Sequence, residues 1–256
     1  MGSGRNAPRP APRAEDGGDA ASGERPDGLQ EMAARYARRA GLEDRYSLLR
    51  PEVWQAVQER QRAMIGLLVA HGMSDLAALR VVEVGCGAGG NLLELLRLGL
   101  QPQHLCGIEL LPERAQAARQ RLPAAVRVVE GDAAAQPIAP GSVDIVLQST
   151  VFSSLLDDGV QQRLAATMWR WLRPGGGVLW YDFTVGNPRN PDVRGVPLRR
   201  VRELFPQGRV DARRVTLAPP LARAACRVHP RLYAALNVLP PLRTHVLAWI
   251  GRHVAD

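Results

Sequence analysis

Three acidic residues stand where strand-like runs of the sequence end, and together they could bind a nucleotide-like ligand. Glu83 precedes a glycine-rich segment at 85–90, and Glu109 and Asp132 each close a later apolar run. Glycines allow a backbone to turn tightly and to approach a ligand closely. Carboxylates at the ends of neighbouring strands can accept hydrogen bonds from ribose hydroxyls or from an adenine amino group. These residue types at these positions predict a nucleotide-like binding site.

The charges around the glycine turn distinguish between two kinds of ligand. The spacing Gly85-x-Gly87-x-x-Gly90 is shared with turns that bind the pyrophosphate of dinucleotides. A carboxylate at Glu83 would repel a pyrophosphate, whereas it would attract an amino group directly or through water. S-adenosylmethionine carries such an amino group together with a cationic sulfonium. We therefore expect this methyl donor in place of a dinucleotide.

Alternating strands and helices must position these side chains. Strands are expected at 79–85, 104–110, 126–132, 143–149 and 177–183, and helices at 91–100, 112–122 and 158–172. Two further helices, 28–42 and 51–73, precede the first strand, and the segment 173–177 stops the last helix of the series. Near-continuous apolar strands that alternate with helices predict a parallel sheet covered on both faces.

Composition limits the remaining possibilities. The 256 residues are 46% apolar, which suits one substantial core, and residues 1–27 have the composition of a disordered tail. All 33 basic residues are arginine and the net charge is +8. Most arginines are scattered among acids, as on a solvated surface, and only 189–214 forms a denser basic stretch.

Cysteines and hydropathy indicate the environment. The three cysteines lie far apart without a metal-binding spacing, so we expect no metal site, no disulfide framework and a reducing, cytoplasmic location. We expect no signal peptide and no transmembrane segment, because no apolar run is long enough.

The segments 81–90, 107–119, 128–157 and 168–183 resemble the ordered motifs of class I S-adenosylmethionine-dependent methyltransferases. The resemblance implies an α/β fold, a Rossmann-like doubly wound seven-stranded sheet whose seventh strand runs antiparallel between the fifth and the sixth. It places the methyltransferase domain at 28–256. Its parts are an N-terminal helical cap (28–78), a cofactor-binding core (79–217), a helical lid insertion between strands six and seven (218–243) and the last strand (244–252).

The resemblance also implies which residues hold S-adenosylmethionine and its product, S-adenosylhomocysteine. The residues implied to hold the methionine part are Glu83, Gly85, Cys86 and Gly87. Glu109 is implied to bind the ribose, and the adenine is implied to contact Leu110, Asp132 and Ala133. The boundary between cofactor and acceptor falls to Gln148, Ser149 and Phe152.

A looser resemblance, carried by 45–51 and 179–195, is to small bacterial methyltransferases of glycan and natural-product biosynthesis, and implies a small-molecule or glycoconjugate acceptor. Acceptor-binding candidates are Tyr36, Tyr46, Phe152, Asn187 and Arg189. The candidate general bases are Asp182, near the carboxyl end of the fifth strand, and His245, at the start of the seventh strand.

Two other hypotheses remain open from the sequence. An RNA methyltransferase would use the arginines of 189–214, but the chain shows no appended RNA-binding module, and "LQSTVFSS" stands where an Asn/Asp-Pro-Pro-Tyr type motif would be. A nucleic-acid partner is therefore not expected. The chain could alternatively bind the cofactor without catalysis and act as an interaction protein. The sequence does not indicate an oligomeric state.

Overall fold

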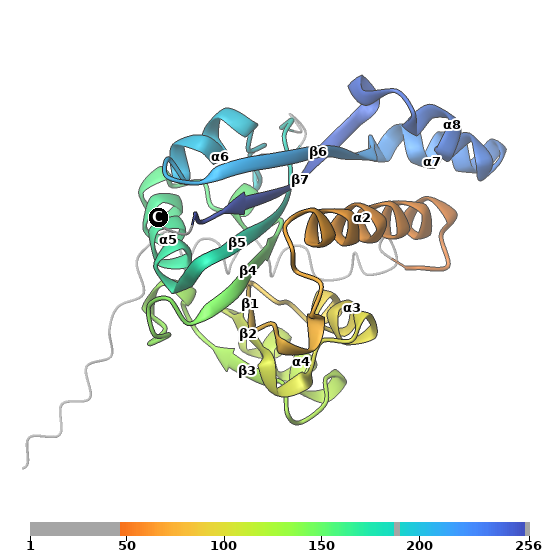
Figure 1. Cartoon of the computed structure of the whole chain (residues 1–256). Helices are drawn as coiled ribbons and strands as arrows, with labels where there is room; N and C mark the ends of the chain where they lie inside the picture. The colour runs from red at the N-terminus through yellow and green to blue at the C-terminus, as the bar shows by residue number, and fades with distance from the viewer. Residues whose placement is uncertain (1–46, 187–189, 254–256) are drawn as a thin grey trace, which may run out of the picture.

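The computed structural model describes residues 47–186 and 190–253 (Figure 1). Several expectations lie outside the described residues: the tail 1–27, the helix 28–42, and the acceptor candidates Tyr36, Tyr46, Asn187 and Arg189.

The seven expected strands form one sheet in the order β3-β2-β1-β4-β5-β7-β6. The strands are β1 (Val81–Val84), β2 (Leu105–Glu109), β3 (Arg127–Glu130), β4 (Val143–Ser149), β5 (Leu172–Phe183), β6 (Arg209–Leu217) and β7 (Arg243–Gly251). The neighbours from β3 to β5 pair in parallel, and β7 pairs antiparallel with both β5 and β6. The Rossmann-like doubly wound sheet with an antiparallel seventh strand is confirmed.

Helices cover both faces of the sheet (Figure 1). They are α2 (Pro51–Ala70), α3 (Gly90–Leu98), α4 (Pro112–Arg121), α5 (Asp158–Trp171), α6 (Leu198–Leu204), α7 (Pro219–Val228) and α8 (Arg231–Asn237). Apolar side chains of α2, α3 and α4 pack on one face and those of α5 and α6 on the other, so each face has its own buried cluster. The helical insertion between strands six and seven is present as α7 and α8.

The carboxyl ends of β1, β2 and β4 lie side by side, because these strands pair in parallel with Val84 opposite both Ile108 and Gln148. β1 is central in the sheet and is buried along its whole length. The strand order reverses between β1 and β4, and ligands of open α/β sheets bind at such a point.

Two local features differ from expectation. The segment 173–177, expected to stop the preceding helix, belongs to an earlier start of β5, where the pairing with β4 shifts between Val143 and Ile145. At this shift Gly176 packs against the backbone of Asp144, where a side chain would not fit. The second feature is α6, a short helix within the basic stretch 189–214 that the sequence did not indicate.

Candidate functional site

The turn after β1 is built from glycines in left-handed conformations. Gly85 has a φ of 65°, and a Cβ there would lie 2.5 Å from Cγ2 of Val151. Gly89, with a φ of 81°, is the residue that caps α3. Gly90, the third glycine of the spacing, lies inside the helix with a negative φ and open space around its Cα. The turn therefore needs Gly89 where the sequence pattern indicated Gly90.

Glu109, at the end of β2, holds the glycine turn in place. Its Oε2 accepts a hydrogen bond from the N–H of Gly87 at 2.7 Å, and its Oε1 accepts one from the N–H of Leu111 at 3.1 Å. The carboxylate is buried. Each oxygen retains a lone pair, so a diol could still be bound by the same carboxylate.

A cavity opens beside these strand ends and gathers half of the expected cofactor residues. The expected residues that line it are Gly85, Glu109, Leu110, Asp132 and Ala133. The sequence did not indicate the others, which are Val84, Ile108, Arg114, Gly131, Ala134, Val151, Leu155, Val160, Arg163 and Leu164. The lining combines apolar walls with two carboxylates and two arginines, as expected for a ligand that has a flat apolar part and polar ends.

Asp132 is oriented by the backbone that follows it. Its Oδ1 accepts a hydrogen bond from the N–H of Ala134 at 2.9 Å and so caps the short helix η4 (Ala133–Ala135). This contact fixes the carboxylate at the cavity wall. A preorganised acceptor at this position fits the amino group of an adenine.

Glu83 is fully buried in β1. Its Oε1 accepts a hydrogen bond from Nδ2 of Asn91 at 2.6 Å, whereas its Oε2 has no hydrogen-bond partner among the described residues. Burial raises the pKa of Glu83 to about 8, and the Asn91 hydrogen bond and the positive charge of Arg60 only partly oppose this. A buried carboxylate with one unsatisfied oxygen fits a cationic group such as the amino group of S-adenosylmethionine.

The other five expected cofactor residues do not line the cavity, and they are Glu83, Cys86, Gly87, Gln148 and Ser149. The Cys86 side chain is buried against Gly107, and burial raises the pKa of its thiol, which suits packing. Gln148 is buried, donates a hydrogen bond to the Tyr181 carbonyl and accepts one from the Val151 N–H. Ser149 ends β4 next to Gln148.

The loop after β4 holds a strained residue. Thr150 has a φ of 58°, which is uncommon for a β-branched residue, and its N–H donates to the Tyr181 carbonyl at 2.8 Å. Phe152 follows and is buried in the α5 side of the core, where it packs 4.6 Å from the Trp180 ring. Strained backbone of this kind concentrates at functional sites.

The two candidate bases lie on opposite faces of the sheet. Asp182 is buried on the α5 face, where its oxygens accept hydrogen bonds from the N–H groups of Ser153 and Phe183, and burial raises its pKa to about 7. His245 lies on the α2 face, stacked 5.1 Å from the Tyr181 ring. Burial, with a smaller effect of the Arg60 charge, lowers its pKa to about 4. The structure does not bring the two side chains together.

A polar network on the α2 face was missed by sequence reasoning. Oε2 of Glu59 accepts hydrogen bonds from the Thr216 N–H and the Tyr233 hydroxyl, each at 3.0 Å. Arg60 pairs with Glu94 at 3.0 Å and lies 5.1 Å above the Tyr181 ring. Asn91, the partner of Glu83, was missed as well. Its position in the first turn of the helix after the glycines was the one sequence signal that could have indicated any of these residues. The others depend on how α2 docks on the sheet.

No helix within the described residues is both long enough and apolar enough to cross a membrane. In the same part of the chain, no cluster of three or more His, Cys, Asp or Glu side chains could hold a metal ion.

Known proteins resemble the chain over this same region. A family model described as "Methyltransferase domain" matches residues 81–176. Trans-aconitate 2-methyltransferase of Afipia carboxidovorans is 30% identical over 212 residues, which cover 79% of this chain and 75% of that protein. A tRNA N(3)-cytidine methyltransferase of Homo sapiens is 30% identical over 115 residues, 42% of this chain and 30% of that protein.

The matched region spans less than half of some relatives, including 43% of trans-aconitate 2-methyltransferase of Paracidovorax citrulli, which is 36% identical over 46% of this chain. Among solved structures, an S-adenosylmethionine-dependent methyltransferase from Mesorhizobium loti matches with a TM-score of 0.54 at 15% identity, covering 73% of this chain and 96% of that one. At this identity the similarity shows only that the two chains share a fold.

Proposed function

Because the chain belongs to the class I S-adenosylmethionine-dependent methyltransferases, we propose that it transfers a methyl group to an oxygen or nitrogen of a small-molecule or glycoconjugate acceptor. S-adenosylmethionine is the methyl donor. The acceptor class is inferred from the basic stretch 189–214, which an RNA methyltransferase would use to bind its substrate. Three of the seven described arginines of this stretch, Arg194, Arg199 and Arg200, are engaged with acids of the same chain.

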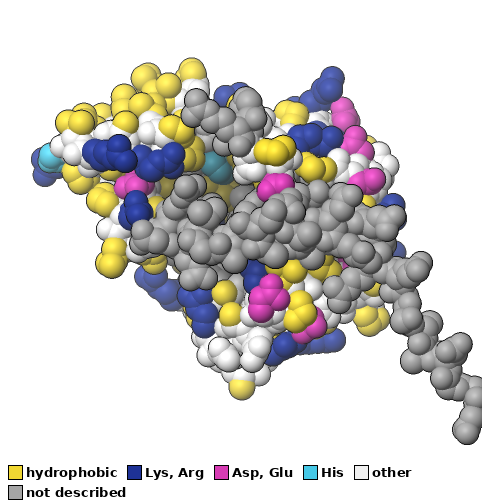
Figure 2. All heavy atoms as spheres, turned by 180° about the vertical axis from the view of Figure 1, so that it is seen from behind, with side chains coloured by type: hydrophobic (Ala, Val, Ile, Leu, Met, Phe, Trp, Pro, Cys, Tyr) yellow, Lys and Arg dark blue, Asp and Glu magenta, His cyan; other side chains and the backbone are white. Residues whose placement is uncertain are grey.

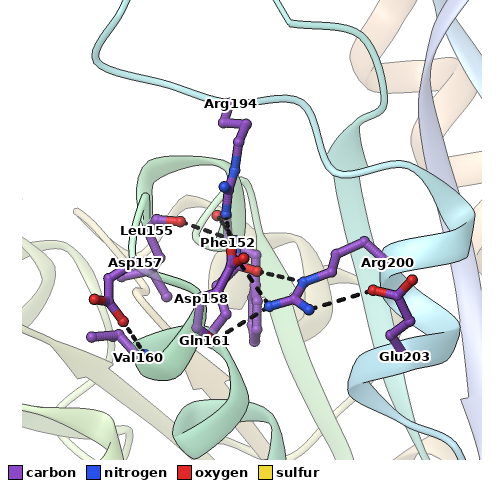
Figure 3. Close-up of polar contacts among 9 residues, drawn as sticks. All are labelled: Phe152, Leu155, Asp157, Asp158, Val160, Gln161, Arg194, Arg200 and Glu203. Carbon is purple, nitrogen blue, oxygen red and sulfur yellow. Dashed lines mark hydrogen bonds and ion pairs between the residues drawn. The ribbon is translucent and has the colours of Figure 1, made fainter.

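Figure 3 shows the ion pairs of Arg194 and Arg200. Arg194 pairs with Asp158, and Arg200 contacts both Asp158 and Glu203. Arg199 also pairs with Glu203. Cations that are neutralised within the chain release fewer counterions from a nucleic acid, so we infer that these three arginines contribute little to RNA binding.

Two of the same arginines also contact the loop after β4, directly or through Gln161, and this loop is the expected boundary between cofactor and acceptor. Nε of Arg200 donates to Oε1 of Gln161, whose Nε2 donates to the carbonyls of Phe152 and Leu155 (Figure 3). The N–H of Arg194 donates to the Ser153 carbonyl at 2.8 Å. We propose that these arginines hold the loop after β4 in position, in place of binding RNA.

The cofactor is held, in this proposal, by three carboxylates with separate tasks. Glu83 ionises to pair with the amino group, Glu109 accepts the ribose hydroxyls while it fixes the N–H of Gly87, and Asp132 accepts from the adenine. Leu110 and Ala133 line the same cavity and supply apolar contacts for the adenine ring. The glycine turn and the loop after β4 are supported by Cys86, Gln148 and Ser149, which do not line the cavity.

S-adenosylmethionine, when bound, would supply a methyl group on a positively charged sulfur to a lone pair of the acceptor, and S-adenosylhomocysteine would remain. The protein must therefore align the acceptor and exclude water, and positioning alone can lower the barrier by roughly 7–11 kcal/mol in favourable cases. A base that removes the acceptor proton adds about 100-fold to 10,000-fold.

We propose different roles for the two candidate bases. His245 is neutral at neutral pH because its pKa is about 4, and it lies among aromatic side chains at the start of β7. Its imidazole is therefore unprotonated, as a general base must be, and its low pKa makes it a weak base. Asp182 instead positions the loop after β4 through the N–H of Ser153.

The acceptor class can be tested with donor that carries a labelled methyl group. The purified chain would be incubated with it and with separated low-mass, glycolipid and RNA extracts of the source cell. We expect label in the low-mass or glycolipid fraction. Label that enters the RNA alone would overturn the proposal, and label in none of the fractions would favour a silent binding protein.

A further inference from the structure

The helical insertion of α7 and α8 forms a hairpin that extends away from the carboxyl end of β6 (Figure 1). Its inner face is packed. Ala222, Cys226 and Tyr233 are buried against Leu217, and Ala56 of α2 joins this small core. The Tyr233 hydroxyl donates to Glu59. The hairpin is therefore fixed to the body of the protein through its inner face alone.

The outer face of the hairpin is apolar and exposed. Val228 is 78% exposed and Val238 70% exposed, and Leu232 and Leu239 are exposed as well. Beside it lie exposed Leu49, just before α2, and Trp54 in the first turn of α2. α2 contacts both hairpin helices, and the charge of Glu52 in its first turn acts on Cys226, so the start of α2 lies beside the end of α7.

The charge of the hairpin has one sign. Residues 212–253 contain seven arginines and no aspartate or glutamate. Arg223, Arg227 and Arg231 are exposed on the hairpin, and none of the three forms an ion pair within the described part of the chain. Figure 2 shows this end of the molecule, at the upper left, with hydrophobic side chains and arginines side by side.

We propose that the outer face of the α7–α8 hairpin, defined by Arg223, Arg227, Val228, Arg231, Leu232, Val238 and Leu239, docks on a bilayer that contains anionic lipid. Aliphatic side chains interleaved with arginines match an interface that is anionic at its surface and apolar below. The acids that face the hairpin from α2 do not cancel this charge, since Glu59 is engaged with Tyr233 and Glu52 is only partly exposed.

Two other occupants fit less well. A single-stranded nucleic acid favours aromatic stacking platforms between cations, whereas the exposed large apolar side chains of the hairpin are aliphatic and the exposed aromatic residue Trp54 lies on α2. A second copy would bring two basic faces together, and like charges repel. An anionic bilayer is complementary both to the exposed aliphatic side chains and to the arginines of the hairpin. Because the hairpin follows directly from β6, docking would turn the carboxyl edge of the sheet, where the site lies, toward the lipid.

The test is sedimentation of the full chain with vesicles of phosphatidylcholine alone or with added phosphatidylglycerol. The variant R223Q/R227Q/R231Q removes three hairpin charges. The control R199Q/R202Q/R209Q removes three exposed arginines from α6 and the start of β6, at the opposite end of that strand. Both variants have the same net charge, so general attraction of a basic protein to anionic vesicles affects them equally.

We expect binding to the anionic vesicles only, weakened by roughly a hundredfold in the hairpin variant, since each basic residue near such a surface contributes about fivefold. The control should bind within about threefold of the unmodified chain. V228S/V238S should also weaken binding, because it removes apolar side chains that insert and leaves the charge unchanged.

Three results would overturn the proposal. One is no binding of the unmodified chain to anionic vesicles, and another is equal weakening in the hairpin variant and the control. The third is binding of RNA, or formation of a dimer, that depends on the hairpin residues while vesicle binding does not. None of these results bears on methyl transfer, which is measured separately with a free acceptor.

Discussion

Binding of the methyl donor should release a proton from Glu83. In the structure its pKa is about 8, because the carboxyl is buried and one oxygen has no partner. At pH 7 the group is therefore mostly protonated. A cationic amino group favours the ionised form, so binding must first ionise Glu83, at a cost of about 1.4 kcal/mol at pH 7.

The sign of the pH dependence follows from this linkage. The cost falls as the pH rises toward 8, so affinity for the donor should increase by roughly 25-fold between about pH 6 and pH 7.5. At pH 7 binding should release about 0.9 proton. His245 does not contribute in this range, since its pKa is about 4.

Isothermal titration calorimetry in buffers of different ionisation enthalpy measures both quantities. Glu83→Gln should bind with little dependence on pH and should lose about tenfold or more of the affinity at pH 7.5, where a charge-assisted hydrogen bond is missing. Asp182→Asn is the matched control, because Asp182 titrates in the same range on the other face of the sheet. The same slope in the unmodified chain and in Glu83→Gln, or an affinity that falls as pH rises, would refute the reasoning.

Three other predictions concern the turn, the strand ends and the loop. Gly85→Ala should lower the melting temperature, because it forces a side chain into a left-handed residue against Val151, whereas Gly90→Ala should leave the temperature unchanged or raise it; equal effects would contradict the turn geometry. Glu109→Ala should weaken donor affinity by at least about tenfold, and Glu130→Ala, its exposed neighbour in register, should not; calorimetric titration distinguishes them. Asp182→Asn leaves one backbone N–H without its acceptor and should destabilise the fold by about 1–3 kcal/mol and slow turnover, with donor affinity little changed. An unchanged denaturant midpoint with reduced turnover would instead point to a direct role in proton transfer.

The strands of the core could be predicted because their signals are local. β4 begins and ends where the apolar run 143–149 predicts, and the acids at 83, 109 and 132 follow from the ends of such runs. The choice between Gly89 and Gly90 could not be made, because both are glycines and only the cap geometry of α3 decides which one needs a positive φ.

The relation between Asp182 and His245 depends on pairing that the sequence does not reveal. Side chains alternate between the faces of a strand, and β7 pairs with β5 so that His245 lies opposite Phe183. Asp182 therefore points to the other face. Arg60 and Glu59 were missed for a similar reason, since their partners lie 34 residues or more away and are reached only when α2 docks on the sheet.

A crystal structure of the chain with S-adenosylhomocysteine tests the central claim most directly. The account predicts ribose hydroxyls within hydrogen-bond distance of Glu109, adenine beside Leu110 and Asp132, and the amino group at the unsatisfied oxygen of Glu83. A product bound away from the carboxyl ends of β1, β2 and β3, or with its amino group remote from Glu83, would contradict it.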